Sequence, residues 1–273
     1  MKMSNKLTIV TVNFNTSDFL EVMLFAFEKL SPNRYPTIIC DNGSDQENVL
    51  KLIELQRKYS NVEVFFRNQS QAGSIGHAEA IDILVNRVET PYFMVMDADC
   101  CVLRKNWDNI VFDQLKNNVK VFGTPRLLQN GESLDDFPTV FSTVYDNVAF
   151  QELGCSFMPG PGGASCKEDT GYLISKRFSE RNLSYKNLIA KNTRHYKDGP
   201  FGDILCAEYY VDEELKDIFS CHFSRGSSSG KAKYEEGILL KIPFINKIIR
   251  HLNGKRDRRK WIERAYKLLG QVN

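Results

Sequence analysis

The stretch Met94-Val95-Met96-Asp97-Ala98-Asp99-Cys100 ends an apolar run with two carboxylates that one small residue separates. Residues 92–96 are aromatic, β-branched or long and apolar, which predicts a buried strand. Asp97 and Asp99 follow that strand, and open α/β sheets bind ligands beyond the carboxyl ends of their strands. Because side chains alternate along an extended chain, both carboxylates share a direction. Such oxygen ligands suit Mg²⁺ or Mn²⁺, whereas the alternative is a solvated turn.

Strand and helix patterns alternate from the start of the chain to this stretch, with short connections between them. This order predicts a mostly parallel α/β sheet flanked by helices. The turn after the first strand lacks the Gly-X-Gly-X-X-Gly sequence of a dinucleotide-binding oxidoreductase, and the chain has no P-loop. The predicted strands are 7–12, 35–40, 62–66 and 92–96, and the predicted helices are about 17–30, 45–59 and 75–88.

Polar side chains follow the other predicted strands at the same edge of the sheet. Asn13 follows the first strand, and Asp41 and Asn42 follow the second. The carboxyl ends of parallel strands meet at one edge, so these side chains and the two carboxylates converge there. Convergent polar groups of this kind predict a small-molecule pocket.

The composition is that of an ordinary globular protein with one large domain or one domain and an appendage. The chain has 273 residues, of which 42% are hydrophobic and 26% are charged. Its net charge of only +2 gives no indication of nucleic-acid binding. Seven cysteines without the spacing of a zinc site favour a reducing compartment. No apolar run reaches the roughly 18 residues of a membrane span, and a cytoplasmic protein is expected.

Four motifs at these strand ends, in this order and spacing, resemble the family 2 nucleotide-sugar glycosyltransferases of GT-A fold. The resemblance covers roughly residues 7–106 and continues more loosely to about residue 229. It implies transfer of a sugar from a nucleotide-diphosphate donor, UDP- or dTDP-type favoured, to a hydroxyl of a glycan or lipid-linked acceptor, with inversion. The motifs are Thr11-Val12-Asn13-Phe14-Asn15, Asp41-Asn42-Gly43-Ser44-Asp45, the helix entrance from Gly73 to Asp82, and Asp97-Ala98-Asp99.

The resemblance implies donor contacts along this sheet edge. Asp41 hydrogen-bonds the base, and Asp97 faces the ribose and diphosphate. Ser44 or Asp45 also suits a helix cap, which is the plainer interpretation of that motif. His77 stands where the family tends to carry Arg or Lys, so it is either a phosphate or sugar contact or a structural histidine. The expected donor-binding residues are Val12, Asn13, Asp41, Asn42, Ser44, Gly73, His77, Asp97 and Arg225.

The resemblance assigns a Mn²⁺ or Mg²⁺ ion to Asp99 together with Asp97, and it adds His222 as a further ligand. His222 lies in a predicted strand at 218–223, and imidazole is an acceptable ligand for Mn²⁺. The following loop carries Arg225 among small residues, which suits the wrapping of a diphosphate. The alternative for this loop is a plain flexible linker.

In the family, a carboxylate at a helix start beyond the metal motif is the catalytic base, and Glu168 and Asp169 match this place. A helix is expected to begin there and to run to about residue 181. Inverting transfer needs such a base to take the proton of the acceptor hydroxyl. Asp169, directly before Thr-Gly, is preferred over Glu168. Both are alternatively first-turn carboxylates that complement the helix dipole.

The segment between the metal motif and this helix shows little regularity. Residues 123–150 have few periodic patterns, and the stretch Gly-Glu-Ser-Leu-Asp-Asp at 131–136 is typical of a loop. Two prolines and three glycines at 159–164 exclude a regular element. The resemblance places the acceptor in this region, with Pro161, Gly162 and Gly163 as expected contacts. The alternative is a flexible surface loop.

The tail, residues 231–273, differs in composition from the rest of the chain. It contains twelve Lys and Arg against four Asp and Glu, a formal charge of about 12 − 4 = +8. A basic amphipathic segment with aromatic residues is typical of contact with an anionic membrane, here the inner face of the plasma membrane. Packing of its helices on the domain or on a second subunit is the open alternative. The expected division is a catalytic domain at 1–230, with donor half 1–106 and acceptor half 107–230, followed by the tail.

Two other functions compete with this interpretation. A sugar-phosphate nucleotidyltransferase shares the α/β core and the metal chemistry. It normally carries a Gly-rich loop with Arg and Lys after the first strand, which Asn13-Phe14-Asn15 does not supply. A non-catalytic, membrane-associated assembly protein with a transferase-like core is the second rival. The intact Asp97, Asp99, Asp169 and His222 argue against it.

Overall fold

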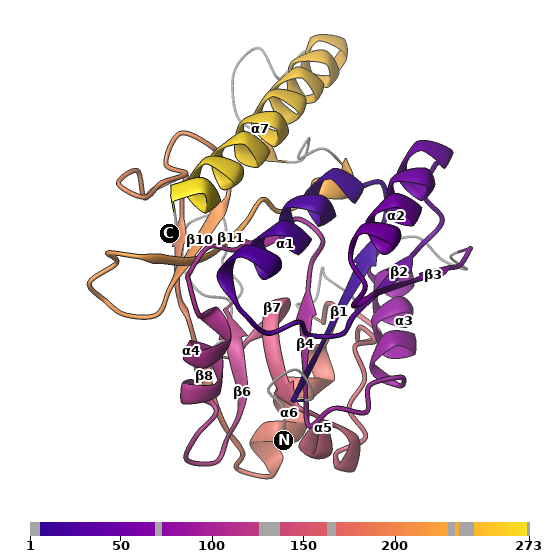
Figure 1. Cartoon of the computed structure of the whole chain (residues 1–273), viewed down its shortest axis with the longest axis vertical. Coiled ribbons are helices and arrows are strands. Elements are labelled where there is room, and N and C mark those ends of the chain that lie inside the picture. Colours follow the sequence, from indigo (N-terminus) through magenta and orange to yellow (C-terminus); the bar gives the residue numbers. More distant parts are fainter. Residues whose placement is uncertain are drawn as a thin grey trace.

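The computed structural model describes residues 6–68, 73–125, 137–162, 168–228, 233–234 and 243–271 of the chain. Gly163 and the tail residues 231–232, 235–242 and 272–273 lie outside these ranges. Within them the chain forms a seven-stranded sheet in the order β3-β2-β1-β4-β7-β6-β8, with helices on both faces (Figure 1). A second sheet has the order β5-β11-β10-β9. The predicted fold class, a mostly parallel α/β sheet flanked by helices with a helical tail, is confirmed.

The donor half of the large sheet is parallel, as the alternating pattern predicts. Strands β1, β2 and β4 of this half are buried on both faces and therefore appear as continuous apolar runs, whereas the edge strand β3 is partly exposed. Ile9 and Met94 pack on one face, whereas Val10 and Val95 pack on the other. The elements are β1 (Leu7–Asn13), α1 (Ser17–Leu30), β2 (Thr37–Asp41), α2 (Gln46–Lys58), β3 (Val62–Phe66), α3 (Gly73–Val85) and β4 (Tyr92–Met96).

Residues 123–150, which show few periodic patterns, contain a strand and a helix, and the loop-like stretch 131–136 lies outside the described residues. Strand β7 (Thr139–Asp146) inserts between β4 and β6 (Val119–Thr124) and is antiparallel to both, and α5 (Asn147–Glu152) follows it. The buried Ser142 and Thr143 interrupt the apolar pattern of β7, and the consecutive residues 142–145 are all buried, so no alternation of buried and exposed side chains marks them. Strand β8 (Ser184–Asn187) extends the sheet beyond β6, to which it is parallel.

The second sheet carries His222 to the predicted metal site. Its strand β11 pairs antiparallel with β5, which starts immediately after Asp99, and this register sets His222 opposite Cys100. The chain therefore brings a residue of its last strand to the end of β4. The remaining elements are β5 (Cys100–Val102), α4 (Trp107–Gln114), α6 (Tyr172–Glu180), β9 (Ile189–Asn192), β10 (Ala207–Tyr210), β11 (Ile218–His222) and the 3₁₀ turn η3 (Gly226–Ser228).

The basic tail ends in the long helix α7 (Pro243–Gln271), which lies beside α1 (Figure 1). Its carboxyl-terminal half joins the hydrophobic core through Trp261, Ala265 and Leu269, each with an exposed fraction of 0%. Two of its cations, Lys260 and Arg264, form ion pairs with Asp203. Packing on the domain, one of the two predicted alternatives, is thus what this half of α7 does. No helix in the described ranges has the length and apolar character needed to cross a bilayer.

Candidate functional site

Two carboxylates and one imidazole meet at the carboxyl end of β4. The Nε2 atom of His222 lies 3.2 Å from Oδ1 of Asp99 and 3.7 Å from Oδ2 of Asp97. The turn that positions them is fixed by backbone hydrogen bonds, from the Asp97 N–H to the Phe141 carbonyl and from the Phe223 N–H to the Asp99 carbonyl, both 2.9 Å. The three predicted metal ligands are therefore brought together by β4, β7 and β11.

The donor atoms of this cluster fit a divalent cation. The Oδ1 atom of Asp97 is buried and forms no hydrogen bond within the described residues, although the Nε2 atom of His77 lies 3.4 Å from it, so a further ligand would stabilise this oxygen. Burial acts to raise the pKa of Asp99, but the charge and hydrogen bond of His222 and the Gly226 N–H outweigh it and lower this pKa. The carboxylate is therefore ionised and able to serve as a ligand.

Cys100 also brings its sulfur within 4.8 Å of the ligand atoms of Asp99 and His222. Burial, followed by the charges of Asp99 and Asp97, raises the pKa of this thiol well above its ordinary value. The thiol thus stays protonated, and a thiolate is the form that binds metal. Two carboxylates and an imidazole remain, which is a ligand set suited to Mn²⁺ or Mg²⁺.

The loop after β11 closes over Asp99. The Gly226 N–H donates to Oδ2 of Asp99 over 2.7 Å, which leaves Oδ1 facing His222. A Cβ atom at position 226 would lie 2.8 Å from the Asp99 Cβ, so this close approach requires glycine. Ser224 and Arg225 both adopt left-handed conformations, with φ of 66° and 59°. The Arg225 side chain is exposed, and its predicted contact with a diphosphate stays a prediction.

The predicted base-binding residues meet at the ends of β1 and β2. Asn13 donates from Nδ2 to Oδ1 of Asp41 over 2.8 Å, and Ser44 donates from its hydroxyl to the same oxygen over 2.5 Å. Asp41 is 2% exposed, and Val12 and Asn42 beside it are also buried. The cap of α2 is Asp45, whose side chain accepts from the Asn48 N–H. The contact of Val12, Asn13, Asp41, Asn42 and Ser44 with the donor stays a prediction.

The predicted metal ligands Asp97, Asp99 and His222 together form the metal cluster. His77 lies in α3 and faces this cluster. Its Nε2 atom is 3.4 Å from Oδ1 of Asp97. Burial acts to lower the pKa of His77, but Asp97, Asp99 and Asp169 together raise it above its ordinary value. The neighbouring carboxylates therefore favour the protonated form of this imidazole, and its contact with a phosphate stays a prediction. Gly73, with φ of 71°, begins the same helix.

Glu168 and Asp169 lie before α6 rather than in its first turn, because Gly171 is the left-handed N-cap and the helix begins at Tyr172. The prediction of a helix start at these carboxylates is wrong by these few residues. Glu168 turns to the loop at 160–162, where its Oε2 accepts from the Gly162 N–H over 2.8 Å. The charge of Asp169 contributes to the raised pKa of His77, and its role as the base stays a prediction. Pro161 and Gly162 form the turn against Glu168, and Gly163 lies outside the described residues.

Arg67 is a residue of this edge that the sequence interpretation missed. It follows β3, its N–H donates to the Asp41 carbonyl over 3.0 Å, and its Nη2 pairs with Glu79 over 2.8 Å. Its Nη1 is buried and has no hydrogen-bond partner among the residues with described placement. The sequence did contain the information needed to find Arg67, because a cation directly after the third parallel strand must lie at the same edge of the sheet as Asp41.

A cavity of about 630 Å³ lies at the opposite edge of the sheet. Tyr92 at the start of β4 and Asp146 at the end of β7 line it, together with Lys120 and Arg181. Lys120 and Asp146 pair with each other over 2.8 Å. None of the predicted site residues lines this cavity within the described part of the chain, so it is not the predicted donor pocket.

A mostly parallel α/β sheet with an Asp-X-Asp motif and a histidine at its carboxyl edge defines the GT-A class of glycosyltransferases. The family model described as glycosyl transferase family 2 matches residues 8–158, which is more than half of the chain. The chain therefore belongs to this family and carries its glycosyltransferase domain. Membership favours sugar transfer over the nucleotidyltransferase alternative.

Three similar proteins illustrate this relationship. The teichoic acid poly(glycerol phosphate) polymerase of Staphylococcus epidermidis is 30% identical over 96 residues, which are 35% of this chain and 13% of that protein. The chain thus spans a small part of the curated relative that it matches. The mannosyltransferase PcManGT of Pyrobaculum calidifontis, solved with GDP-Man and Mn²⁺, has 12% identity and a TM-score of 0.52 over 97% of this chain and 74% of that one. TarS of S. aureus, solved with UDP-GlcNAc, has 12% identity and a TM-score of 0.44 over 56% of this chain and 48% of that one.

Proposed function

We propose that this protein transfers a sugar from a nucleotide-diphosphate donor to a hydroxyl of a glycan or lipid-linked acceptor, with Mn²⁺ or Mg²⁺ held by Asp97, Asp99 and His222. The observation that carries the proposal is the convergence of these three side chains, with distances of 3.2 and 3.7 Å from the imidazole to the carboxylates. The Asp97 carboxylate supports it, because its buried Oδ1 atom forms no hydrogen bond within the described residues and has only the imidazole of His77 at 3.4 Å as a charged neighbour there, so a cation would stabilise this oxygen.

The chemistry needs a charged leaving group to be neutralised and a proton to be removed. A divalent cation held by Asp97, Asp99 and His222 would supply positive charge to the departing diphosphate. Asp169 takes the proton of the acceptor hydroxyl while that oxygen attacks the anomeric carbon, and a single displacement of this kind inverts the configuration. Asp169 is preferred as the base because the Glu168 carboxylate already accepts a hydrogen bond from the Gly162 N–H and so holds the 160–162 loop.

The donor base lies against Val12, Asn13 and Asp41 in this proposal. Uracil and thymine each present one ring N–H, and the Asp41 carboxylate is an acceptor for it, so UDP or dTDP is the expected nucleotide. Arg67 beside Asp41 supports the same pocket, since its buried Nη1 needs an acceptor such as a base carbonyl. His77 and Arg225 contact the diphosphate.

The acceptor enters beside Pro161, Gly162 and Gly163. A lipid-linked or membrane-bound acceptor is supported by the amino-terminal half of α7, where Ile248 and Leu252 are 45% and 60% exposed on a basic helix. We therefore place this half of the helix on an anionic membrane surface at the cytoplasmic face. Sedimentation with vesicles of phosphatidylglycerol, compared with phosphatidylcholine, tests this placement. Leu252→Glu should bind the phosphatidylglycerol vesicles more weakly than the wild type does. Equal sedimentation of the wild type and Leu252→Glu with these vesicles would contradict the placement of the helix on the membrane.

Calorimetric titration with UDP, dTDP, GDP and CDP, each with and without Mn²⁺, tests the donor site. GDP belongs in the set because the mannosyltransferase of similar fold was solved with GDP-Man and Mn²⁺. We expect one nucleotide to bind tightly only when both Mn²⁺ and Asp99 are present, so that Asp99→Asn abolishes the binding. Absence of binding by all four nucleotides would refute the proposal.

The base is tested by release of the nucleoside diphosphate from the donor that binds. Removal of a general base costs about 10²–10⁴-fold in rate. We expect this loss in Asp169→Asn, with donor affinity unchanged. The matched variant Glu168→Gln keeps an acceptor oxygen for the Gly162 N–H and should retain most of the rate. The reverse ranking would assign the base to Glu168.

A further inference from the structure

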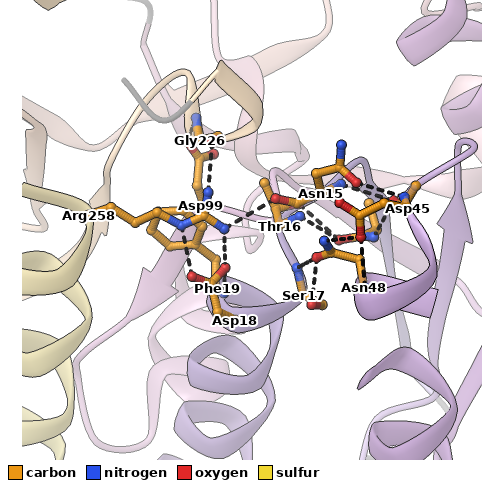
Figure 2. A network of polar contacts seen from close by, with 12 residues as sticks. Asn15, Thr16, Ser17, Asp18, Phe19, Asp45, Asn48, Asp99, Gly226 and Arg258 are labelled. Atoms are coloured by element: carbon orange, nitrogen blue, oxygen red, sulfur yellow. Dashed lines mark hydrogen bonds and ion pairs between the residues drawn. The ribbon is translucent and has the colours of Figure 1, made fainter. Parts of the chain in front are cut away.

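Arg258 of α7 contacts two loops that frame the metal cluster (Figure 2). Its Nη1 donates to the Gly226 carbonyl over 3.3 Å, and its Nη2 donates to the Asn15 carbonyl over 3.2 Å. Its Nε donates to Oδ2 of Asp18 over 2.8 Å, and Nη2 also contacts the other oxygen of that carboxylate. One guanidinium thus ties the loop after β11 to the loop between β1 and α1.

The carbonyl and the amide N–H of Gly226 form hydrogen bonds with two different side chains. The carbonyl accepts from Arg258, while the N–H donates to Oδ2 of Asp99 over 2.7 Å. Figure 2 shows Gly226 and Asp99 beside the end of the Arg258 side chain. A displacement of this residue therefore changes the hydrogen bond that decides which Asp99 oxygen faces His222.

Both loops hold conformations that need external support. Asn15, Ser224 and Arg225 all have φ between 56° and 66°, in the left-handed region that non-glycine residues avoid. Such residues persist when the surrounding structure determines their conformation. Arg258 provides part of that support, with its guanidinium 4.7 Å above the ring of Phe19 and its side chain only 19% exposed.

We infer that Arg258 is a positioning residue of the metal site: it holds Gly226 in the place from which the N–H orients the Asp99 carboxylate. The inference rests on the proposed function insofar as Asp99 is a metal ligand. A tail residue thereby contributes to a site more than a hundred positions earlier in the chain. Residues that orient a metal ligand through one hydrogen bond commonly change metal affinity about 10–100-fold when removed.

A purely structural ion pair is the competing explanation, and α7 supplies a matched control for it. Arg264 also fixes the helix to the domain, through the Pro200 carbonyl and Asp203, and within the described part of the chain it forms no hydrogen bond or ion pair with Asp97, Asp99, His222 or Gly226. If Arg258 serves only to attach α7 to the domain, Arg258→Met and Arg264→Met should change the Gly226 amide and Mn²⁺ binding to the same extent. If Arg258 positions Asp99, only the first variant should disturb the site.

Hydrogen exchange of the metal-free protein tests the inference without any ligand. We expect the Gly226 amide, followed in peptides that span 223–228, to exchange about tenfold faster or more in Arg258→Met. In Arg264→Met it should exchange at the wild-type rate. Equal exchange in the wild type and both variants, or equal acceleration in both variants, would overturn the inference.

Binding of Mn²⁺ alone, followed by electron paramagnetic resonance, completes the test. We expect the dissociation constant to rise about tenfold or more in Arg258→Met and to stay within about twofold in Arg264→Met. Arg258→Lys should restore only part of the affinity, because an ammonium lacks the fork that reaches Gly226, Asn15 and Asp18 together. Wild-type affinity in Arg258→Met would refute the positioning role.

Two further outcomes remain distinguishable. If the wild type and Asp99→Asn both fail to bind Mn²⁺, the proposed function fails, and the exchange of Gly226 still decides the role of Arg258. If Arg258→Met does not fold, Asp18→Asn takes its place, because Asp18 is 45% exposed and orients the guanidinium. This variant should show the same two changes at smaller size, and their absence would overturn the inference.

Discussion

Replacement of Gly226 by alanine tests how closely the loop after β11 must approach the metal cluster. The added Cβ would lie 2.8 Å from the Asp99 Cβ and 2.9 Å from its Oδ2. Carbon atoms in ordinary contact are about 3.5–4.0 Å apart, so the overlap is roughly 0.7–1.2 Å. Because Asp99 is buried and its turn is fixed by backbone hydrogen bonds, the strain cannot relax freely. We expect a loss of about 1–3 kcal/mol in the free energy of unfolding, as for other overpacked sites.

The same overlap must also disturb the predicted metal ligand. Either the loop retreats and lengthens the 2.7 Å hydrogen bond from the Gly226 N–H, or the Asp99 carboxylate rotates away from His222. A hydrogen bond to a charged group contributes about 1.5–3 kcal/mol, and this is the interaction at stake in the first case. Both movements displace Oδ1, so Mn²⁺ affinity should fall by about tenfold or more.

Urea unfolding and Mn²⁺ titration of Gly226→Ala measure the two effects. Gly270→Ala is the matched control, because a Cβ at that position of α7 meets no atom within 4 Å. Alanine is the better helix former by up to about 1 kcal/mol, so the control should be neutral or slightly stabilised, with unchanged Mn²⁺ affinity. Wild-type stability and Mn²⁺ affinity in Gly226→Ala would refute the reasoning, since they would mean that the loop does not contact Asp99.

Three further predictions concern buried side chains. Trp261→Ala removes an aromatic ring with 0% exposure and should lower the free energy of unfolding by about 3–5 kcal/mol in urea titrations. Asp108→Ala leaves the hydroxyls of Ser31 and Tyr35 and the amide of Asn33 without their buried acceptor, so a loss of at least about 3 kcal/mol is expected in the same assay. Burial raises the pKa of Glu208 above its ordinary 4.5, so the native protein binds this proton more tightly than the unfolded chain does. The stabilisation that this proton provides is full below pH 4.5 and is lost as pH rises through the raised pKa of Glu208. The free energy of unfolding of the wild type, relative to that of Glu208→Gln, should therefore fall from pH 4.5 to neutral pH. A difference between the two proteins that does not change with pH would contradict this.

The donor half of the fold and the metal cluster could be predicted because local pattern and topology agree there. Parallel strands are buried on both faces and so appear as apolar runs, and their carboxyl ends share one edge. This placed Asn13 beside Asp41 and both near Asp97, as the structure has them. His222 was predicted from the family resemblance alone, because no local pattern links β11 to β4.

The missed features depend on contacts between distant parts of the chain. Strand β7 contains the buried Ser142 and Thr143, whose polarity is compatible with its central place but erases the apolar signal. The start of α6 was misplaced because Gly171 adopts a left-handed N-cap. The partner of Arg258 lies 240 positions earlier, so a count of charges in the tail could not distinguish a docked cation from a membrane-facing one.

The core and the site meet in the aromatic cluster beneath Arg258. Trp261 packs with its ring centroid 5.3 Å from that of Phe19 and 6.3 Å from that of Phe223. Phe19 directly follows Asp18, which pairs with Arg258, and Phe223 directly follows His222. The apolar contact that docks α7 therefore also fixes the backbone on both sides of the metal cluster. Since side chains in such a core cannot shift independently, the position of the helix and the geometry of the predicted ligands are set by the same packing.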